Sequence, residues 1–391
     1  DEILFHGFSA GGASQVATED LPSSMLATTI VDFSGLADMS MTDLQKALTG
    51  KNVSHSATIN SNTEVVSGSA SVKDLETLLQ LNYLAFTAPR RDEEAYQTLM
   101  SILKSQLANK DKNPKAVFMD SVQMMSTNYS ARTVLEDMAL IDKVNLDKAL
   151  DIYKARFANP ADFVFTFVGN VDPNNKEFQD MVCTWLGGMK TSKKKEKVVD
   201  HNVRVASGIQ KNYFTRKMET KTATNRIQYT SYNIPYTLSN DLNMEMIGRI
   251  LSTRYLESIR EREGGSYGVG CAGMMDIRPV PCARLLMQFD TDPEKQEKLM
   301  SIIHEEVNTI VENGPLAKDL NKEKESMLKD LQEDLEKNGY WQTVLYMNYF
   351  YDIDYIADYK SAVEGITAES VQSMLKKLVA SGNMFEVVML P

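Results

Sequence analysis

Two stretches, ARFANPADFVFTFVG at residues 155–169 and LVASGNMFEVVMLP at residues 378–391, decide how this chain folds. In both, the end of a helix-forming segment is followed by a turn and then by an almost wholly apolar run. An apolar run of about 4–8 residues bounded by turn residues is typical of a buried strand. Because the same order occurs near the middle and at the end of 391 residues, the pattern predicts a duplicated unit.

The repeat extends further along the chain. Pro89 and Pro315 each precede a long helical segment, and Asn145 and Thr367 each precede the helix that leads into the apolar run. A repeat of roughly 225 residues is far longer than the 20–50 residues of solenoid repeats, so it indicates two homologous domains. We predict a first domain over residues 1–188, a linker over 189–203 and a second domain over 204–391. The basic run Lys190–Lys197 is interpreted as a solvated linker.

The order of elements favours an α+β fold. Residues 53–71 alternate between β-branched and polar residues as a hairpin does, and residues 267–275 and 283–290 have the character of paired strands. Helical segments are grouped between these hairpins, including one that begins at an N-cap at Ser239 and one over residues 316–338. Each domain is therefore predicted to be a mostly antiparallel sheet packed against helices.

Composition excludes several classes of function. The net charge of −11 disfavours nucleic acid as a partner, because its phosphates would be repelled. No apolar run reaches the roughly 20 residues that span a bilayer. The three cysteines, Cys183, Cys271 and Cys282, have neither the spacing of a zinc site nor the even number of a disulfide framework.

The four histidines do not predict a metal site. None of His6, His55, His201 and His304 lies in H-E-x-x-H or H-x-x-E-H, the spacings that place two imidazoles on one face of a helix. His304 has Asn308 where a second ligand would stand, so we interpret it as a partly exposed helix residue. No metal ligand is therefore assigned in this chain.

One stretch, IREREGGSYGVG at residues 259–270, has a pattern that allows chemistry. A long helix ends in a charged turn, and Gly264 and Gly265 allow a tight reversal into a strand that begins with Tyr267. Arg260 and Tyr267 can project to one side, where a guanidinium and a phenol could grip peptide carbonyls and a developing oxyanion. In the simpler interpretation Arg260 balances the helix dipole and Tyr267 is a half-buried strand residue. The residues alone leave both interpretations open.

The same stretch resembles the signature of the C-terminal half of pitrilysin-type metallopeptidases, relatives of insulin-degrading enzyme, in which an Arg is followed seven residues later by a Tyr. Three further stretches are similar to this family in the same order: FHGFSAGGASQ (residues 5–15), the hairpin and helix over residues 47–81, and FVGNVDPNNKEFQDMVCTWLG (residues 167–187). The resemblance covers essentially the whole chain. It implies two tandem domains of the metallopeptidase or processing-peptidase-like α/β roll.

The resemblance also implies that this half carries no zinc. The family site is H-x-x-E-H with a Glu roughly 75 residues later, and the matching positions here, Leu26–Ile30 and Ser105–Gln106, offer neither His nor Glu. Zinc is then expected in a missing N-terminal half, fused or separate, and this chain alone is expected to be inactive. The partners implied are that half and an unfolded peptide enclosed between the two halves.

In that family the Arg/Tyr pair serves the zinc site of the other half. Carried over, Tyr267 would hydrogen-bond the scissile carbonyl or its oxyanion and Arg260 would hold a neighbouring carbonyl, with Gly264 and Gly265 placing both. The alternative is a non-catalytic partner subunit or an assembly module of the same fold. The resemblance suggests the bacterial periplasm. It also suggests that the first domain lacks its outermost strand, which would leave the strand containing Phe5 with an open edge.

Overall fold

The computed structural model describes residues 2–219, 221–261 and 268–391. Its contacts divide the chain into two compact units, and each unit takes a segment from the opposite half of the sequence. The first unit comprises Asp1–Asn109, Val134–His201 and Leu335–Ile353, and the second comprises Lys110–Thr133, Asn202–Asp334 and Asp354–Pro391. The division into residues 1–188 and 204–391 stays a prediction.

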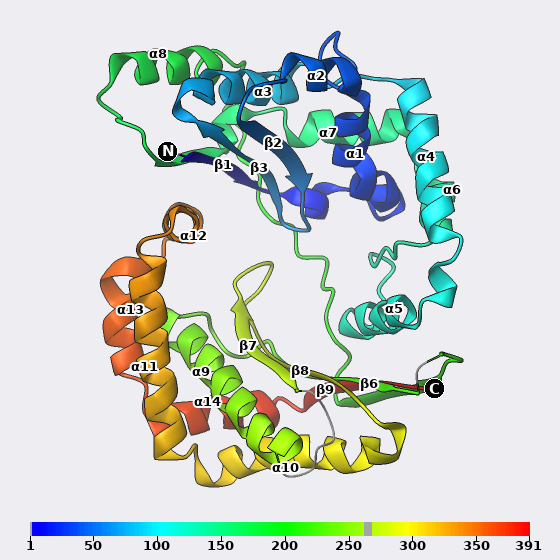
Figure 1. Ribbon diagram of the computed structural model, residues 1–391, viewed down its shortest axis with the longest axis vertical. Coiled ribbons are helices and arrows are strands. Elements are labelled where there is room, and N and C mark those ends of the chain that lie inside the picture. Colours follow the sequence, from blue (N-terminus) through cyan, green and yellow to red (C-terminus); the bar gives the residue numbers. More distant parts are fainter. Residues whose placement is uncertain (1, 220, 262–267) are drawn as a thin grey trace. The chain divides into compact units, whose positions relative to one another are not determined.

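The first unit contains a four-stranded antiparallel sheet. Its order is β2-β3-β1-β4, and its strands are β1 (Glu2–Ala10), β2 (Val53–Ile59), β3 (Thr63–Ser71) and β4 (Val164–Gly169). β2 and β3 form the predicted hairpin, and β4 is the apolar run predicted within residues 155–169. The sheet is drawn in blue to green in Figure 1.

Strand β1 lies inside this sheet, so the expected open edge along Phe5 is wrong. Phe5 is opposite Gly68 of β3 on one side and Phe167 of β4 on the other. Ile3, Phe5 and Phe8 are fully buried. The pairing of β1 with β4 joins residues that lie about 160 positions apart, and such pairing leaves no local pattern in the sequence.

Helices pack against this sheet and complete the first core. They are α1 (Leu21–Ser34), α2 (Met41–Ala47), α3 (Leu75–Thr87), α4 (Glu93–Leu107), α6 (Met138–Lys143), α7 (Leu146–Arg156), α8 (Lys176–Trp185) and α12 (Asn338–Tyr351). Short 3₁₀ turns lie at Gly12–Gln15, Thr18–Asp20, Val72–Asp74 and Pro160–Asp162. Asn145 caps α7 as predicted, since its Oδ1 accepts a hydrogen bond from the backbone N–H of Lys148 at 2.9 Å.

Helix α12 belongs to the second half of the sequence but packs against β1 and β4 of the first unit. The rings of Tyr346 and Phe350 meet Phe8 edge-on, with centroids 4.8 and 5.5 Å away. Edge-to-face contacts of this kind stabilise beyond the area they bury. The sheet of the first unit is therefore covered in part by a segment that follows β1 by more than 300 residues.

The second unit contains a five-stranded sheet of order β5-β9-β6-β8-β7. Its strands are β5 (Ile209–Thr215), β6 (Ala223–Ser231), β7 (Gly270–Asp276), β8 (Cys282–Thr291) and β9 (Asn383–Leu390). β5 pairs parallel with β9, and the other pairs are antiparallel. Strands β7, β8, β6 and β9 repeat the order of β2, β3, β1 and β4, and β5 is an addition that the sequence argument missed. The predicted α+β fold of two helix-packed sheets is confirmed.

The helices of the second unit are α5 (Pro114–Ser126), α9 (Leu238–Tyr255), α10 (Gln296–Asn313), α11 (Ala317–Asp334), α13 (Tyr355–Glu364) and α14 (Ala368–Ala380). A π-helical turn, Leu256–Glu261, continues α9, and 3₁₀ turns lie at Lys110–Lys112 and Pro293–Lys295. The N-cap predicted at Ser239 is wrong: Thr237 accepts from the backbone N–H of Asn240 at 3.0 Å instead. The helix predicted over residues 316–338 ends at Asp334.

Helix α5 belongs to the second unit although it lies in the first half of the sequence, the reverse of α12. It comes from the first half of the sequence and packs on β9 of the second unit. Phe118 and Val122 of α5 form one apolar cluster with Phe385 and Val387 of β9, and all four side chains are buried. Alternate residues of β9 point to the opposite face, so this strand is buried on both sides.

The basic run predicted as a solvated linker has exposed lysines but a fastened backbone. The side-chain amide of Asn159 donates to the carbonyl of Lys194 at 2.7 Å and accepts from the N–H of Ser192 at 2.8 Å. Within the same run, Glu196 pairs with Arg156, whose side chain is only 9% exposed. These contacts hold the segment against the first unit.

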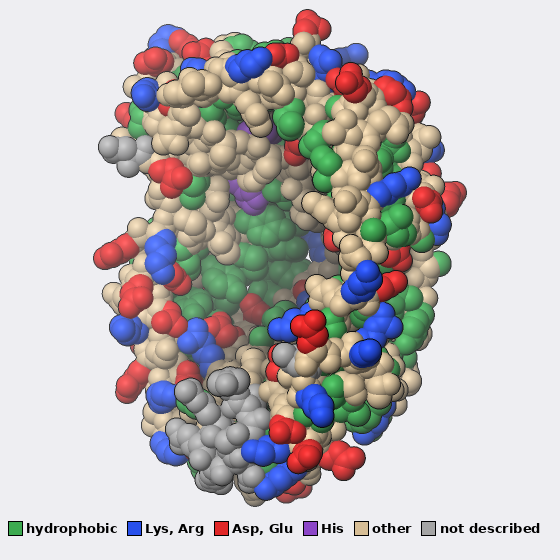
Figure 2. All heavy atoms as spheres, turned by 45° about the vertical axis from the view of Figure 1, so that its right-hand side comes forward, with side chains coloured by type: hydrophobic (Ala, Val, Ile, Leu, Met, Phe, Trp, Pro, Cys, Tyr) green, Lys and Arg blue, Asp and Glu red, His purple; other side chains and the backbone are tan. Residues whose placement is uncertain are grey.

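Charges of both signs are mixed on the surface. On the face drawn in Figure 2, Lys and Arg side chains alternate with Asp and Glu rather than forming one basic surface. This mixing agrees with the net charge of −11. Within the described residues, no helix has the length and apolar character needed to cross a membrane.

Candidate functional site

The predicted Arg/Tyr stretch falls between α9 and β7. Arg260 lies in the π-helical turn that continues α9, but its side chain lies outside the described residues, as do Gly264, Gly265 and Tyr267. Their roles therefore stay a prediction. The structure describes the two elements that flank them, because α9 leads into the stretch and β7 follows it.

These two flanking elements are in backbone contact. A Cβ atom on Gly248 of α9 would overlap the backbone nitrogen of Gly273 in β7, and one on Gly273 would overlap the carbonyl oxygen of Met244. Only two facing glycines allow a helix and a strand to approach so closely. The hydroxyl of Ser252 also donates to the carbonyl of Cys271 at 3.2 Å. Helix and strand therefore hold a fixed position on either side of the Arg/Tyr stretch.

The glycines of residues 268–273 have a G-x-G-x-x-G spacing that formally matches a dinucleotide fingerprint. Such a fingerprint needs a strand before it and a helix after it. Here the helix comes first, and Gly270 and Gly273 lie on strand β7. Of these glycines, Gly273 packs against α9, and the order of helix before strand does not fit a dinucleotide site.

The end of α9 is anchored in the second core. Tyr255 is 1% exposed and donates its hydroxyl to the carbonyl of Ile303 in α10 at 3.2 Å. Ile259, one residue before Arg260, is fully buried. The turn that carries Arg260 is thus anchored to the second core by the burial of Ile259 and by the hydrogen bond of Tyr255.

The positions that match the zinc ligands of the family lie on α1 and α4, which pack together in the first unit. Helix α1 contains no His, Cys or Glu, and Ala27, Ile30 and Val31 on it are fully or almost fully buried. Ser105 and Gln106 occupy the matching part of α4. Across the described residues, no group of three or more His, Cys, Asp and Glu side chains could hold a metal ion.

Three of the four histidines make separate local contacts in the first unit. His6 of β1 packs against Phe8 and Tyr346, and burial lowers its pKa. His55 Nε2 forms a hydrogen bond with Asn82 Oδ1 at 3.3 Å. His201 Nε2 forms one with the carbonyl oxygen of Ser14 at 2.8 Å. These contacts place the three rings in structural roles.

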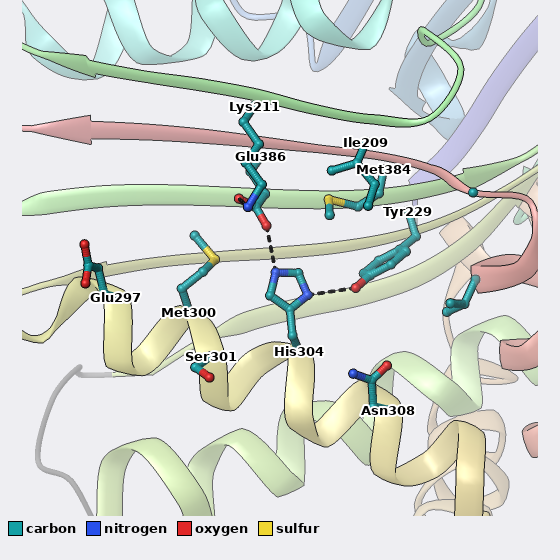
Figure 3. Close-up of a pocket in the computed structure, with 12 residues that line it drawn as sticks. Ile209, Lys211, Tyr229, Glu297, Met300, Ser301, His304, Asn308, Met384 and Glu386 are labelled. Carbon is teal, nitrogen blue, oxygen red and sulfur yellow. Dashed lines mark hydrogen bonds and ion pairs between the residues drawn. The ribbon is translucent and has the colours of Figure 1, made fainter.

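His304 lies in a polar network that the sequence argument missed. Its Nε2 is 2.8 Å from Glu386 Oε1 and its Nδ1 is 2.8 Å from the hydroxyl of Tyr229. Glu386 also accepts from Tyr213 at 2.5 Å and pairs with Lys211 at 3.1 Å. Figure 3 shows His304 pointing from α10 to Glu386 on β9 and Tyr229 on β6. In the sequence, the signal for this network was Glu386, a single acid within the mostly apolar strand β9.

The protonation states of this network follow from its geometry. Burial by itself would raise the pKa of Glu386, but the hydrogen bonds from His304, Tyr213 and Lys211 outweigh it and lower the pKa to about 2. Burial raises the pKa of Tyr229 to about 12, so its hydroxyl keeps its proton. The ionised Glu386 carboxylate and the protonated Tyr229 hydroxyl thus bond the two nitrogens of the His304 ring.

This network lines a pocket of about 500 Å³ within the second unit. The apolar part of its lining comprises Ile209, Met300, Val379 and Met384. Both oxygens of Glu386 and both nitrogens of His304 are already bonded within the protein. The network therefore joins β5, β9, β6 and α10. The polar atoms of Glu386 and His304 are used in these structural bonds.

Comparisons with known proteins identify the class of the chain. Residues 143–327 match the model described as the peptidase M16 inactive domain. The "Zinc protease PQQL-like" protein of Arabidopsis thaliana is 24% identical over 358 residues, which cover 87% of this chain and 34% of that protein. The "Probable zinc protease PqqL" of Escherichia coli (strain K12) is 23% identical over 375 residues, covering 94% and 39%. The chain thus spans less than two fifths of the length of these curated relatives.

A solved structure shares the fold. The crystal structure of the periplasmic protease PqqL from Escherichia coli superposes with a TM-score of 0.84 and 19% identity, covering 100% of this chain and 43% of that one. Residues 143–327 thus match an M16 peptidase inactive domain. More particularly, the chain is a distant homologue of the PqqL-like zinc proteases. The resemblance to the C-terminal half of a zinc metallopeptidase is confirmed at this level.

Proposed function

We propose that this chain is the zinc-free half of a zinc metalloendopeptidase and acts on peptides together with a zinc-bearing half. The match to the M16 inactive domain carries this proposal. Two further observations support it. Its relatives are named zinc proteases and are more than twice as long as this chain, and the sequence contains no H-x-x-E-H.

The residues that the structure describes do not fit a zinc site. The helix that matches the metal helix of the family presents Ala27, Ile30 and Val31 to the core, and catalytic zinc needs three protein ligands and a water. We therefore assign zinc to the other half. The contribution of this chain is to bind and orient the peptide.

Arg260 and Tyr267 are the residues proposed for that contribution. A guanidinium offers two parallel N–H donors, which suits it to hold a peptide carbonyl beside the reacting one. A phenol can donate to the scissile carbonyl, and its hydrogen bond strengthens as negative charge develops on the oxygen. Gly248 and Gly273 support this placement, because they fix the helix and the strand between which both residues lie.

The kinetic test uses the complete peptidase with both halves present. Tyr267→Phe is expected to lower kcat by about 10²–10³-fold with little change in KM, since a donor to the oxyanion acts mainly in the transition state. Arg260→Ala is expected to raise KM and lower kcat together. Both variants should keep their melting temperature. Near-normal turnover with a lowered melting temperature would instead assign the pair to structure and defeat the proposal.

The purified chain alone provides a second test. We expect no peptide hydrolysis above the background and no stoichiometric bound zinc by metal analysis. Adding the zinc-bearing half should restore hydrolysis that a chelator abolishes. Chelator-sensitive peptidase activity in the chain by itself would contradict the proposal.

A non-catalytic subunit or assembly module of the same fold is the alternative. In that case Arg260 and Tyr267 would have no kinetic role, and the chain would form a stable complex whose peptidase activity is insensitive to both substitutions. Sequencing the region upstream of Asp1 separates a fused half from a separate subunit, because H-x-x-E-H in the same reading frame indicates fusion. The periplasm is proposed as the compartment from the likeness to PqqL, and cell fractionation tests it.

A further inference from the structure

Arg254 lies in the last turn of α9 and is clamped between two acids. Its Nε and Nη2 reach the two carboxylate oxygens of Glu306 in α10 at 3.1 and 3.4 Å, and its Nη1 reaches Glu257 at 3.0 Å. The Arg254 side chain is 18% exposed and that of Glu306 is 11% exposed. A two-pronged pair of this kind fixes direction as well as distance.

The clamp extends to a third helix. Lys318 of α11 pairs with the other oxygen of Glu257 at 3.4 Å. Thr253 donates to Glu323 of α11 at 2.9 Å, and the Glu323 side chain is 9% exposed. Burial by itself would lower the pKa of Arg254, but Glu306, Glu257 and Asp319 outweigh it and raise the pKa. The end of α9 is thus held by charge on two sides.

The π-helical turn begins two residues after Arg254. Such turns are rare and are found disproportionately at functional sites. The pair Arg254–Glu257 spans the junction between α-helix and π-helical turn, and Ser258 donates its hydroxyl to the carbonyl of Arg254 at 2.9 Å. Because a π-helical turn is wider than an α-helical one, it changes the direction in which the chain leaves α9. The position of Arg260 therefore depends on whether the π-helical turn is maintained.

We propose that Arg254 is a positioning residue: held by Glu306 and Glu257, it maintains the π-helical turn and so places Arg260 for peptide binding. This inference rests on the function proposed above for Arg260. Arg254 itself faces two helices of its own unit and is assigned no contact with the peptide.

The chain contains a matched control on the same helix. Arg249 also joins α9 to α11, with Nε 2.9 Å from Glu245 and Nη2 2.9 Å from Asp330. Its side chain is 30% exposed, and it lies before the last turn of α9. Substituting Met at either position removes the charge and keeps most of the apolar stem. The two variants lose similar bridges between helices, but only one of them borders the π-helical turn.

The first test uses this chain and does not depend on its function. Hydrogen exchange is measured under native conditions on the wild type, Arg254→Met and Arg249→Met. The backbone amides of residues 256–261 are expected to exchange about tenfold faster in Arg254→Met and unchanged in Arg249→Met. Equal exchange in all three proteins would show that Arg254 does not maintain the π-helical turn.

The second test uses the complete peptidase. Arg254→Met is expected to lower kcat/KM about 10–100-fold, Arg254→Lys less, and Arg249→Met less than about threefold. In the Arg260→Ala background, Arg254→Met should cost less than about threefold, because the residue it positions is already gone. Additive losses would overturn the proposal, since they would mean that Arg254 does not act through Arg260.

The two proposals fail in distinguishable ways. If Arg260→Ala leaves kcat/KM unchanged, the function proposed for Arg260 is wrong, whereas the exchange experiment still decides whether Arg254 holds the turn. If Arg260→Ala is impaired and Arg254→Met equals Arg249→Met in kinetics, only the positioning role is wrong. Melting temperatures of both Met variants show whether general stability separates them.

Discussion

Glu386 shows how one residue can join several elements. It is the only charged residue of β9, and its side chain is 1% exposed. Tyr213 and Lys211 of β5 and His304 of α10 all donate to its carboxylate. The other ring nitrogen of His304 is hydrogen-bonded to Tyr229 of β6. Removing one partner of a buried ionic group leaves the others without compensation, which costs more than the pair itself contributes.

We therefore expect Glu386→Gln to lower the free energy of unfolding by about 3 kcal/mol at neutral pH. Urea denaturation followed by circular dichroism measures this difference. Glu297→Gln is the matched control, because Glu297 lines the same pocket but is exposed, and its effect should stay within about 0.5 kcal/mol. Equal effects of the two substitutions would show that the network contributes nothing to stability.

The same residue predicts a dependence on pH. The pKa of Glu386 is lowered from 4.5 to about 2 in the folded chain, so its ionised form stabilises the fold above its ordinary pKa. The difference in unfolding free energy between wild type and Glu386→Gln should be full above about pH 5. It should shrink as the pH falls from 4.5 towards 2. A difference that grows with acidification would contradict the assignment.

At the scale of elements, the contact between α9 and β7 depends on two glycines. Gly248 lies inside a helix, where alanine is ordinarily better by about 1 kcal/mol. Here an added Cβ would meet the backbone of β7 itself, which cannot move aside like a flexible side chain. Overpacking of this kind therefore outweighs helix propensity.

We expect Gly248→Ala to lower the free energy of unfolding by about 1–3 kcal/mol. The control is Gly339→Ala in α12, where an added Cβ meets nothing within 4 Å, so that stability should stay equal or rise slightly. Thermal and urea unfolding of both variants measures the two effects. A stabilised Gly248→Ala variant would show that α9 and β7 can separate without cost.

At the scale of the whole molecule, the two units exchange helices. α12 covers β1 and β4 of the first unit, and α5 covers β9 of the second. Without α5, the side chains of Phe385, Val387 and Met389, at most 2% exposed in the chain, would lose their cover. Exposed contiguous apolar surface of this kind favours aggregation.

A fragment of residues 204–391 should therefore bind a hydrophobic dye and unfold without a cooperative transition. A synthetic peptide of residues 112–128, which contains α5, should reduce the dye binding, whereas the same peptide with Phe118→Asp should not. Dye fluorescence and circular dichroism check this. A fragment that unfolds cooperatively at the stability of the full chain would show that a domain limit at residue 204 suffices for folding.

Much of the fold could be predicted because it depends on local patterns. The apolar runs of β4 and β9, the hairpin of β2 and β3 and the helices with strong periodicity each leave their mark within about 15 residues. The duplicated order of elements follows from comparing such marks. The missing H-x-x-E-H is likewise a local fact, and it directed the proposal towards a half without zinc.

The sequence by itself therefore determined the α+β class, the repetition and the resemblance to a zinc peptidase half. The tertiary structure decided that β1 lies between β3 and β4, that β5 joins β9, that α5 and α12 change units, and that His304 meets Glu386. The physical reason is that each of these depends on contacts between residues tens to hundreds of positions apart. Such contacts are chosen by burial and hydrogen bonding in the folded chain, and they leave no periodic trace in the segments that make them.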